Sequence, residues 1–267
     1  MNDEEHWYPQ PWNKNELWPS VTTILGAVMS QPGLQTWYAR EAARYAVDNH
    51  AEMTRLLGEG RPDDAVAVAA GEPVRVKEKA ADLGILVHRV AEAITKDQPI
   101  SLTEDEDELV APYLDTLARY VDEMKPKYEW AEAVVHHRWL KYSGTCDAGI
   151  RYGVPVPVVS WAGELLAEYA PGALLVNDYK TGTGKSIRFR AGPQVVGYTG
   201  CTHMDIKDGL GTVVPMPRAD GGAVVHLTPD GYRVHGVRVT PGASAAFAAA
   251  RAWFGWIRGE GTGILGL

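Results

Sequence analysis

The spacing of apolar residues changes its period near residue 125, and this change restricts the chain to folds that combine helices with a sheet. Before that point, apolar residues recur three or four positions apart over 73–96 and over 103–125, which predicts two amphipathic helices. Thr103 and Glu106 form a capping-box pattern at the start of the second helix. The N-terminal half is therefore expected to be helical.

Alternation of apolar and polar residues takes over after that point. Residues 133–142 and 145–152 both alternate, with the Ser-Gly pair at 143–144 as the predicted turn between two strands. Residues 174–180 are predicted as a third strand, and residues 212–239 as a β-meander. We therefore expect an α/β fold in which helices flank a central mixed β-sheet.

No repeat, low-complexity tract or Ser/Gly-rich linker divides the chain, so residues 1–267 are predicted to form a single domain. Residues 1–18 are expected to form an irregular arm, whose tryptophans can either pack against the domain or stack on nucleic-acid bases. Residues 153–172 are expected to be an irregular insertion with a short helix near Glu164. The remaining helices are predicted at 21–29 with Ser20 as N-cap, at 34–57, after Gly192 and Pro193, and at 241–257.

The formal charge is −8, from 26 Lys and Arg against 34 Asp and Glu, which argues against a protein that coats nucleic acid by bulk charge. Positive charge gathers in two windows, 136–141 and 180–190, and each window can be a solvated face or a local contact to nucleic acid. The only two cysteines of the sequence, Cys146 and Cys201, exclude a disulfide scaffold, an all-cysteine zinc site and a four-cysteine iron–sulfur cluster.

The sequence has no feature of a membrane protein or of a secreted one. No apolar run approaches the roughly 18 residues that a membrane-spanning helix needs, and the acidic start of the chain is unlike a signal peptide. We therefore expect no membrane association and a location in the reducing cytoplasm.

Two predicted strands carry side chains suited to bind a metal ion. Alternation places Asp178 and Lys180 on one face of a strand and Asp147 on the polar face of an earlier strand. If these faces meet, Asp147 and Asp178 can hold one hard cation between them. Mg²⁺ prefers oxygen ligands, keeps bound water and neutralises phosphate charge, so this set is suited to phosphodiester hydrolysis. An exposed ion pair between Asp178 and Lys180 at a strand end is the alternative interpretation.

Five short motifs occur in an order that resembles the PD-(D/E)xK nuclease superfamily, and most closely its RecB-like exonuclease branch, which is common in phages. They are GILVH at 84–88, Glu132, GTCD at 144–147, NDYKTG at 177–182 and QVVGY at 194–198. The resemblance extends from about residue 19 to about residue 256. It implies a restriction-endonuclease-like core and a metal-dependent DNA exonuclease of phage-type recombination or repair.

The resemblance also implies a ligand set and a cofactor. It makes Asp147 and Asp178 metal ligands and His88 a further ligand or a near neighbour, with Mg²⁺ or Mn²⁺ as the metal. The cysteines that bind the cluster in iron–sulfur relatives are missing, so no iron–sulfur cluster is expected. The gap between Asp147 and Asp178 is longer than the compact hairpin that this family usually shows, which is why residues 153–172 are interpreted as an insertion.

The other implied roles concern catalysis and DNA. Lys180 is implied as the catalytic lysine, Gln194 as an organiser of the active site, and Glu132 as the acid that precedes the first strand. Contacts to the DNA backbone are expected from Tyr198, Lys185, Arg188 and Arg190. The implied partners are single- or double-stranded DNA, engaged at its ends, and a recombination protein, within the host cytoplasm if the chain is encoded by a phage.

Three other interpretations remain open at this stage. The nuclease fold can be catalytically silent and only bind DNA or a protein. The GTGKS run at 182–186 ends like a nucleotide-binding loop, but the glycine that such a loop needs five positions before Gly184 is Tyr179. A zinc site can recruit histidines and cysteines, although only Cys201 and His203 have the spacing of ligands; the candidates are His136, His137, Cys146, Cys201 and His203.

Overall fold

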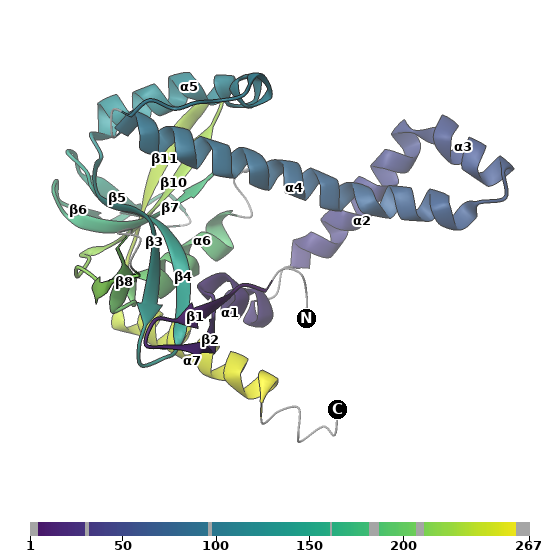
Figure 1. Cartoon of the computed structure of the whole chain (residues 1–267). Coiled ribbons are helices and arrows are strands. Elements are labelled where there is room, and N and C mark those ends of the chain that lie inside the picture. Colours follow the sequence, from purple (N-terminus) through teal and green to yellow (C-terminus); the bar gives the residue numbers. More distant parts are fainter. Residues whose placement is uncertain are drawn as a thin grey trace. The chain divides into compact units, whose positions relative to one another are not determined.

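The chain is described as a computed structural model that covers residues 5–29, 32–95, 98–160, 162–181, 187–206 and 211–259 (Figure 1). These residues contain seven helices and eleven strands. The chain divides into two compact units, one made of Met1–Val28 with Leu86–Leu267 and the other of Met29–Ile85. Helix α4 (Pro62–Thr95) contributes to both units. The expectation of one nuclease-like domain over 1–267 stays a prediction.

The smaller unit is helical in its described residues. It holds α2 (Pro32–Asp48), α3 (His50–Gly58) and the part of α4 up to Ile85. The single helix expected over 34–57 is wrong, because Asn49 adopts a non-helical conformation between α2 and α3. Helix α4 also begins before the expected start at Pro73, since an alanine-rich run precedes this proline and alanine has the highest helix propensity.

The larger unit is built on a seven-stranded sheet whose order is β11-β10-β7-β4-β3-β8-β9. Its strands are β3 (Lys127–His137), β4 (Tyr142–Arg151), β7 (Leu174–Lys180), β8 (His203–Asp205), β9 (Val213–Pro215), β10 (Gly221–Thr228) and β11 (Gly231–Val237). Strand β7 pairs with β10 in parallel and with β4 antiparallel, so the sheet is mixed. The expected α/β fold with a central mixed sheet is therefore confirmed.

The centre of the sheet is strand β7, which has the bounds expected from the sequence. Its first three residues, Leu174, Leu175 and Val176, are all buried, as expected for a strand covered on both faces. The β-meander expected over 212–239 is wrong, because β10 crosses to pair with β7 while β9 stays at the far edge beside β8. Pairing between distant segments, which alternation does not encode, decides this order.

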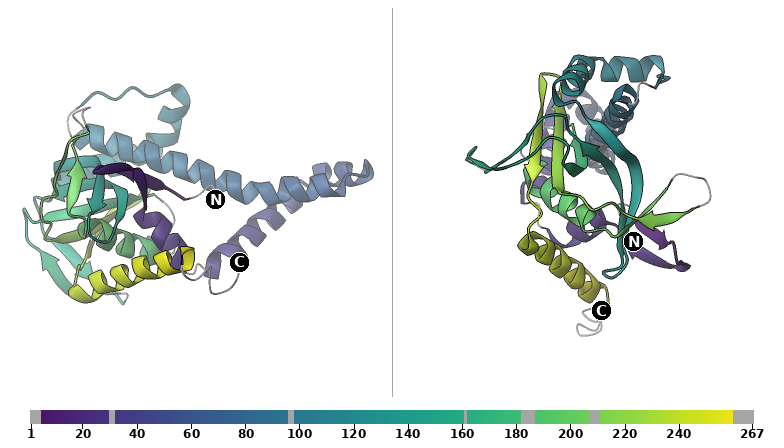
Figure 2. Two further views of the ribbon diagram at one scale, coloured as in Figure 1. Left: turned by 60° about the horizontal axis from the view of Figure 1, so that its bottom comes forward. Right: turned by 90° about the vertical axis from the view of Figure 1, so that its left-hand side faces the viewer.

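Helices cover both faces of the sheet. Helix α5 (Glu104–Met124) lies on one face, where its Tyr120 packs against Tyr179 of β7. Helix α6 (Ile187–Thr199) lies on the other, where its Val195 packs against Val224 of β10. Helices α1 (Val21–Val28) and α7 (Pro241–Arg258) contact each other and α6 (Figure 2). None of the described helices combines enough length with enough apolar character to cross a membrane.

The helix starts that the sequence predicts from capping residues are confirmed. The Ser20 hydroxyl accepts a hydrogen bond of 2.9 Å from the backbone N–H of Thr23 at the start of α1. Thr103 and Glu106 form the complete capping box of α5. Helix α6, however, begins before Gly192, and Pro193 lies inside it.

The N-terminal arm is not irregular. Strands β1 (Trp7–Gln10) and β2 (Asn13–Pro19) form an antiparallel hairpin. Prolines suggested an irregular segment, but a proline is tolerated in a turn or on a strand without a second neighbour. Pro11 lies in the turn and Pro9 on the two-stranded sheet. The prediction of an irregular arm is therefore wrong for the described residues 7–18.

The segment over 153–172 is also more regular than expected. It holds a second hairpin, β5 (Val156–Val159) and β6 (Leu165–Tyr169), and Glu164 lies in the loop between them rather than in a helix. The Tyr169 hydroxyl donates a hydrogen bond of 2.8 Å to the carbonyl of Val237. The hairpin therefore packs against strand β11 at the edge of the sheet.

The turn between β3 and β4 lies at 138–141, not at the predicted Ser-Gly pair. Gly144 belongs to β4, opposite Val135. A Cβ atom on Gly144 would lie 2.6 Å from Cε1 of Tyr198, so this position needs glycine because an aromatic ring packs on the backbone. Glycine is favoured both in turns and where a side chain packs directly on the backbone, so the predicted turn at 143–144 is wrong.

Candidate functional site

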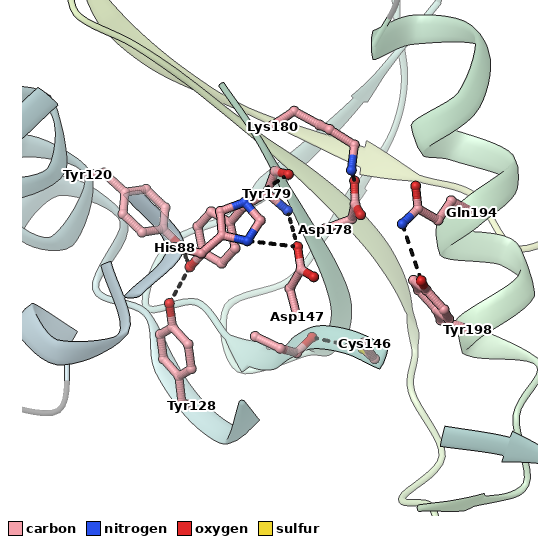
Figure 3. Close-up of polar contacts among 11 residues, drawn as sticks. His88, Tyr120, Tyr128, Cys146, Asp147, Asp178, Tyr179, Lys180, Gln194 and Tyr198 are labelled. Atoms are coloured by element: carbon pink, nitrogen blue, oxygen red, sulfur yellow. Dashed lines mark hydrogen bonds and ion pairs between the residues drawn. The ribbon is translucent and has the colours of Figure 1, made fainter. Parts of the chain in front are cut away.

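Carboxylates from three neighbouring strands gather in the middle of the sheet. The register of β3 and β4 brings Glu132 opposite Asp147. The pairing of β4 with β7 ends one position before Asp147 and Asp178, so these two residues are neighbours where the strands stop pairing. Figure 3 shows Asp178 in contact with Lys180, and Asp147 in contact with His88 and Tyr179. The structure thus brings together the acids and the lysine that the sequence singled out.

His88 reaches this cluster from helix α4. Its Nε2 lies 3.1 Å from the backbone carbonyl oxygen of Tyr179, and its Nδ1 lies 3.6 Å from Oδ2 of Asp147. Because a carbonyl oxygen only accepts hydrogen bonds, Nε2 carries the proton in the neutral ring. The lone pair of Nδ1 then points toward Asp147, which is the arrangement of a histidine prepared to bind a metal ion.

The cluster has the donor set of a metal site. His88, Glu132 and Asp147 each offer a ligand atom, and these atoms all lie within 4.8 Å of one another. Apart from its ion pair with Lys180, Asp178 receives no hydrogen bond at either buried carboxylate oxygen from the described residues. Buried carboxylate oxygens without donors fit a cation as their partner. Asp178, expected as a ligand from the sequence, is a neighbour of Asp147 but is not part of this three-residue group. Two carboxylates and one imidazole, with the Asp178 carboxylate nearby, fit Mn²⁺ and, with less contribution from the imidazole, Mg²⁺.

Glu132 has an uncommon backbone conformation. Its φ angle is 48°, in the left-handed region, within strand β3. A side chain larger than glycine holds this conformation only where the surrounding structure enforces it, and such positions concentrate at functional sites. The backbone conformation of Glu132 therefore supports a role of this residue in the candidate site.

Burial controls the protonation of the two aspartates. Asp178 is 1% exposed, and its desolvation raises the pKa of its carboxyl above the ordinary value. The ammonium of Lys180, 2.6 Å from Oδ2, opposes this rise. Burial raises the pKa of Asp147 as well, although its Oδ2 accepts a hydrogen bond of 2.8 Å from the N–H of Tyr179. The two carboxylates therefore share a site in which a cation would stabilise their charged forms.

His88 is neutral at physiological pH. Desolvation by burial, followed by the positive charge of Lys180, lowers its pKa from 6.5 to about 4. The neutral imidazole is the form that binds metal ions. The burial of His88 thus keeps its imidazole in the neutral form that can bind a metal ion.

This low pKa predicts a pH dependence of stability in the metal-free protein. Folded His88 takes up a proton near pH 4 and the unfolded residue near pH 6.5. Because the unfolded state binds this proton first, the free energy of unfolding is highest above pH 6.5 and decreases as the pH falls toward 4. The shift corresponds to about 3 kcal/mol. In denaturant titrations with EDTA, the wild type should lose about 3 kcal/mol more than His88→Asn over this range. An equal loss in both proteins would contradict the prediction.

Gln194 and Tyr198 border the site on helix α6 (Figure 3). The side-chain amide of Gln194 donates a hydrogen bond of 3.3 Å to the Tyr198 hydroxyl. Burial and then the charges of Asp178 and Asp147 raise the pKa of the Tyr198 hydroxyl. The side chain is only 3% exposed, so the expected contact of Tyr198 with the DNA backbone stays a prediction.

Of the basic residues expected to bind DNA, the structure describes the side chain of Arg190. Lys185 and the side chain of Arg188 lie outside the part of the chain that the structure describes. The guanidinium of Arg190 lies against Gly26 of helix α1, with Nη2 3.4 Å from the position of a Cβ atom there. Their expected role therefore stays a prediction.

Tyr179 contributes to the site in a way that the sequence did not reveal. Its backbone carbonyl accepts from His88 and its N–H donates to Asp147. Its hydroxyl lies 3.1 Å from that of Tyr120 and also contacts that of Tyr128. This network anchors β7 beside the carboxylates. Alternation indicates only that Tyr179 points away from Asp178, and backbone contacts leave no signal in a sequence.

The rival metal and nucleotide sites gain no support. Among the described residues, the single group of potential metal ligands that lie close together contains neither cysteine. His136 instead contacts Ser143 at 2.8 Å and Asp205 at 2.9 Å. The GTGKS run at 182–186 lies outside the described residues.

Comparisons with protein-family models and with curated proteins found no match to this sequence.

Proposed function

We propose that this chain is a metal-dependent nuclease that hydrolyses phosphodiester bonds of DNA. The observation that carries the proposal is the group of His88, Glu132 and Asp147, whose ligand atoms lie within 4.8 Å of one another, beside the ion pair of Asp178 and Lys180 on the neighbouring strand. The mixed sheet with a helix on each face is compatible with a restriction-endonuclease-like core. We further propose an exonuclease of phage-type recombination or repair that acts in the cytoplasm, because the order of the sequence motifs resembles that branch.

In this proposal a Mg²⁺ or Mn²⁺ ion is held by His88, Glu132, Asp147 and Asp178. When bound, such an ion neutralises phosphate charge and lowers the pKa of a coordinated water. The chain's own contribution starts with the backbone of Tyr179, which orients His88 and Asp147. Orientation by such neighbours fixes the tautomer of the histidine and the direction of the carboxylate.

Lys180 supplies the positive charge of the site. Its ammonium is held 2.6 Å from Asp178 and its side chain is 29% exposed, so it borders solvent while it remains anchored to the carboxylate. A compact ammonium at this position can orient the attacking water and stabilise the negative charge that develops on the phosphate. Gln194 and Tyr198 then act as polar groups that position the site from helix α6.

The proposal is tested with end-labelled single-stranded and double-stranded DNA and with circular DNA, each incubated with Mg²⁺, Mn²⁺ or EDTA. We expect shortening of linear DNA with either metal, no reaction in EDTA and protection of the circles. Cutting of circles would change the assignment to an endonuclease. DNA binding without cleavage in any metal would favour the alternative of a catalytically silent nuclease fold.

A further inference from the structure

Two hairpin turns of the larger unit meet in an aromatic and cationic group at the surface. Trp12 lies in the turn between β1 and β2, and Arg138 and Trp139 lie in the turn between β3 and β4. The guanidinium carbon of Arg138 lies 5.1 Å from the ring centroid of Trp12 and 5.8 Å from that of Trp139. These are cation–π distances. We call this group the Trp12–Arg138–Trp139 stack.

The stack is open to solvent. Trp139 is 77% exposed and Trp12 is 41% exposed. Large aromatic side chains are normally mostly buried, and exposed ones gather at binding sites because they offer a large rigid contact area. Trp139 is therefore placed to contact a ligand rather than to complete the core.

The two turns hold the stack in a fixed position. In the turn between β3 and β4, the N–H of Lys141 donates a hydrogen bond of 2.9 Å to the carbonyl of His137. The N–H of Leu140 donates one of 3.1 Å to Nδ1 of His137. Arg251 of α7 donates to the carbonyl of Lys141 at 3.1 Å. In the turn between β1 and β2, Trp12 makes an edge-to-face contact with the ring of His203 of β8, at a centroid distance of 5.0 Å. A preorganised surface loses little entropy when it binds.

The charge of the stack comes from Arg138. Lys141 is paired with Glu16 at 2.9 Å, whereas the described residues include no carboxylate in an ion pair with Arg138. Aromatic rings combined with a guanidinium bind nucleic-acid bases by stacking, and this mode needs bases that are not already paired in a duplex. The chemistry of the stack thus fits a single strand.

We propose that the Trp12–Arg138–Trp139 stack binds unpaired bases of a single-stranded nucleic acid. The inference deepens the proposed function, on which it rests, because it assigns a single-stranded segment to the substrate. Strand β3 connects the two sites, because it carries Glu132 and leads directly into the turn with Arg138 and Trp139. Glu132 and Arg138 are separated along the chain by about 20 Å of strand. A single strand covers this distance with about six nucleotides at the rise of B-form DNA.

The inference is tested by the binding of a fluorescently labelled oligothymidylate, with a blunt duplex as comparison, to the full chain in EDTA. Trp139→Ala should raise the Kd for the single strand about fivefold to a hundredfold, the range for loss of one base–aromatic stack. Trp253→Ala is the matched control, since Trp253 is a tryptophan of α7 that is 54% exposed. This control should bind as the wild type does. Thermal melting of each variant verifies the fold.

Equal Kd values for Trp139→Ala and Trp253→Ala would overturn the inference, and so would an equal loss of affinity for the blunt duplex. Arg138→Lys keeps the charge but loses the planar group, so it should weaken binding as well. Cleavage by the wild type with unchanged binding by Trp139→Ala would reject the stack and leave the nuclease proposal intact. Binding that depends on Trp139 without cleavage in any metal would reject the nuclease and leave the stack intact.

Discussion

Asp147→Asn and Asp178→Asn are each expected to abolish metal-dependent cleavage of DNA while the protein remains folded. Each change removes a negative charge and a ligand from a site where both carboxylates are proposed to hold the cation. Asparagine keeps the shape of the side chain, and its amide oxygen at position 147 can still accept the N–H of Tyr179. The measurement is the initial rate of cleavage with Mg²⁺ and with Mn²⁺, accompanied by circular dichroism.

The matched control is Asp230→Asn, at an exposed aspartate in the turn between β10 and β11. This variant should keep the wild-type rate. A metal-induced rise of the melting temperature, expected for the wild type and for Asp230→Asn, should shrink in Asp147→Asn and Asp178→Asn because ligands that bind only the folded state stabilise it. Full activity in either site variant with a native spectrum would end the hypothesis of a carboxylate-held metal.

Lys180→Ala is expected to lower the turnover number by about a hundredfold to a thousandfold, the range for loss of a group that stabilises charge in the transition state. Affinity for DNA, measured in Ca²⁺, should remain nearly unchanged, since the lysine is proposed to act mainly in the transition state. Lys180→Arg should restore only part of the activity, because a planar guanidinium does not replace a compact ammonium. Loss of affinity as the main effect would contradict this role.

The contrasting variant combines Arg188→Ala and Arg190→Ala. If these arginines contact the DNA backbone, the double change weakens affinity and flattens the dependence of log Kd on log salt by up to about 2 units, at about 0.9 per phosphate contact. Its turnover at saturating DNA should stay near that of the wild type. An unchanged salt slope would remove both arginines from the binding surface.

Short-range interactions explain where prediction from the sequence succeeded. The N-cap Ser20 and the capping box of Thr103 and Glu106 involve residues only three positions apart, so their pattern determines the helix start directly. The buried apolar run that begins at Leu174 predicted strand β7 within its observed bounds. Alternation likewise predicted that Asp178 and Lys180 share one strand face.

Long-range contacts explain the failures. The hairpins β1–β2 and β5–β6 were predicted as irregular because prolines and glycines interrupt their alternation, whereas strand pairing and packing on the rest of the unit decide their conformation. Gly144 was assigned to a turn, although it serves the packing of the Tyr198 ring. The same residue type meets both requirements, and the sequence alone does not distinguish them.

The sequence by itself determined the α/β class, the capped starts of α1 and α5 and the residue types of the candidate site, because these depend on period and on local spacing. Only the tertiary structure decided that Glu132 adopts a left-handed conformation beside Asp147, and that the backbone of Tyr179 holds His88. It alone also joined Trp12 to Arg138 across two hairpins. These features arise from contacts between segments far apart in the chain, and such contacts leave no periodic trace in the sequence.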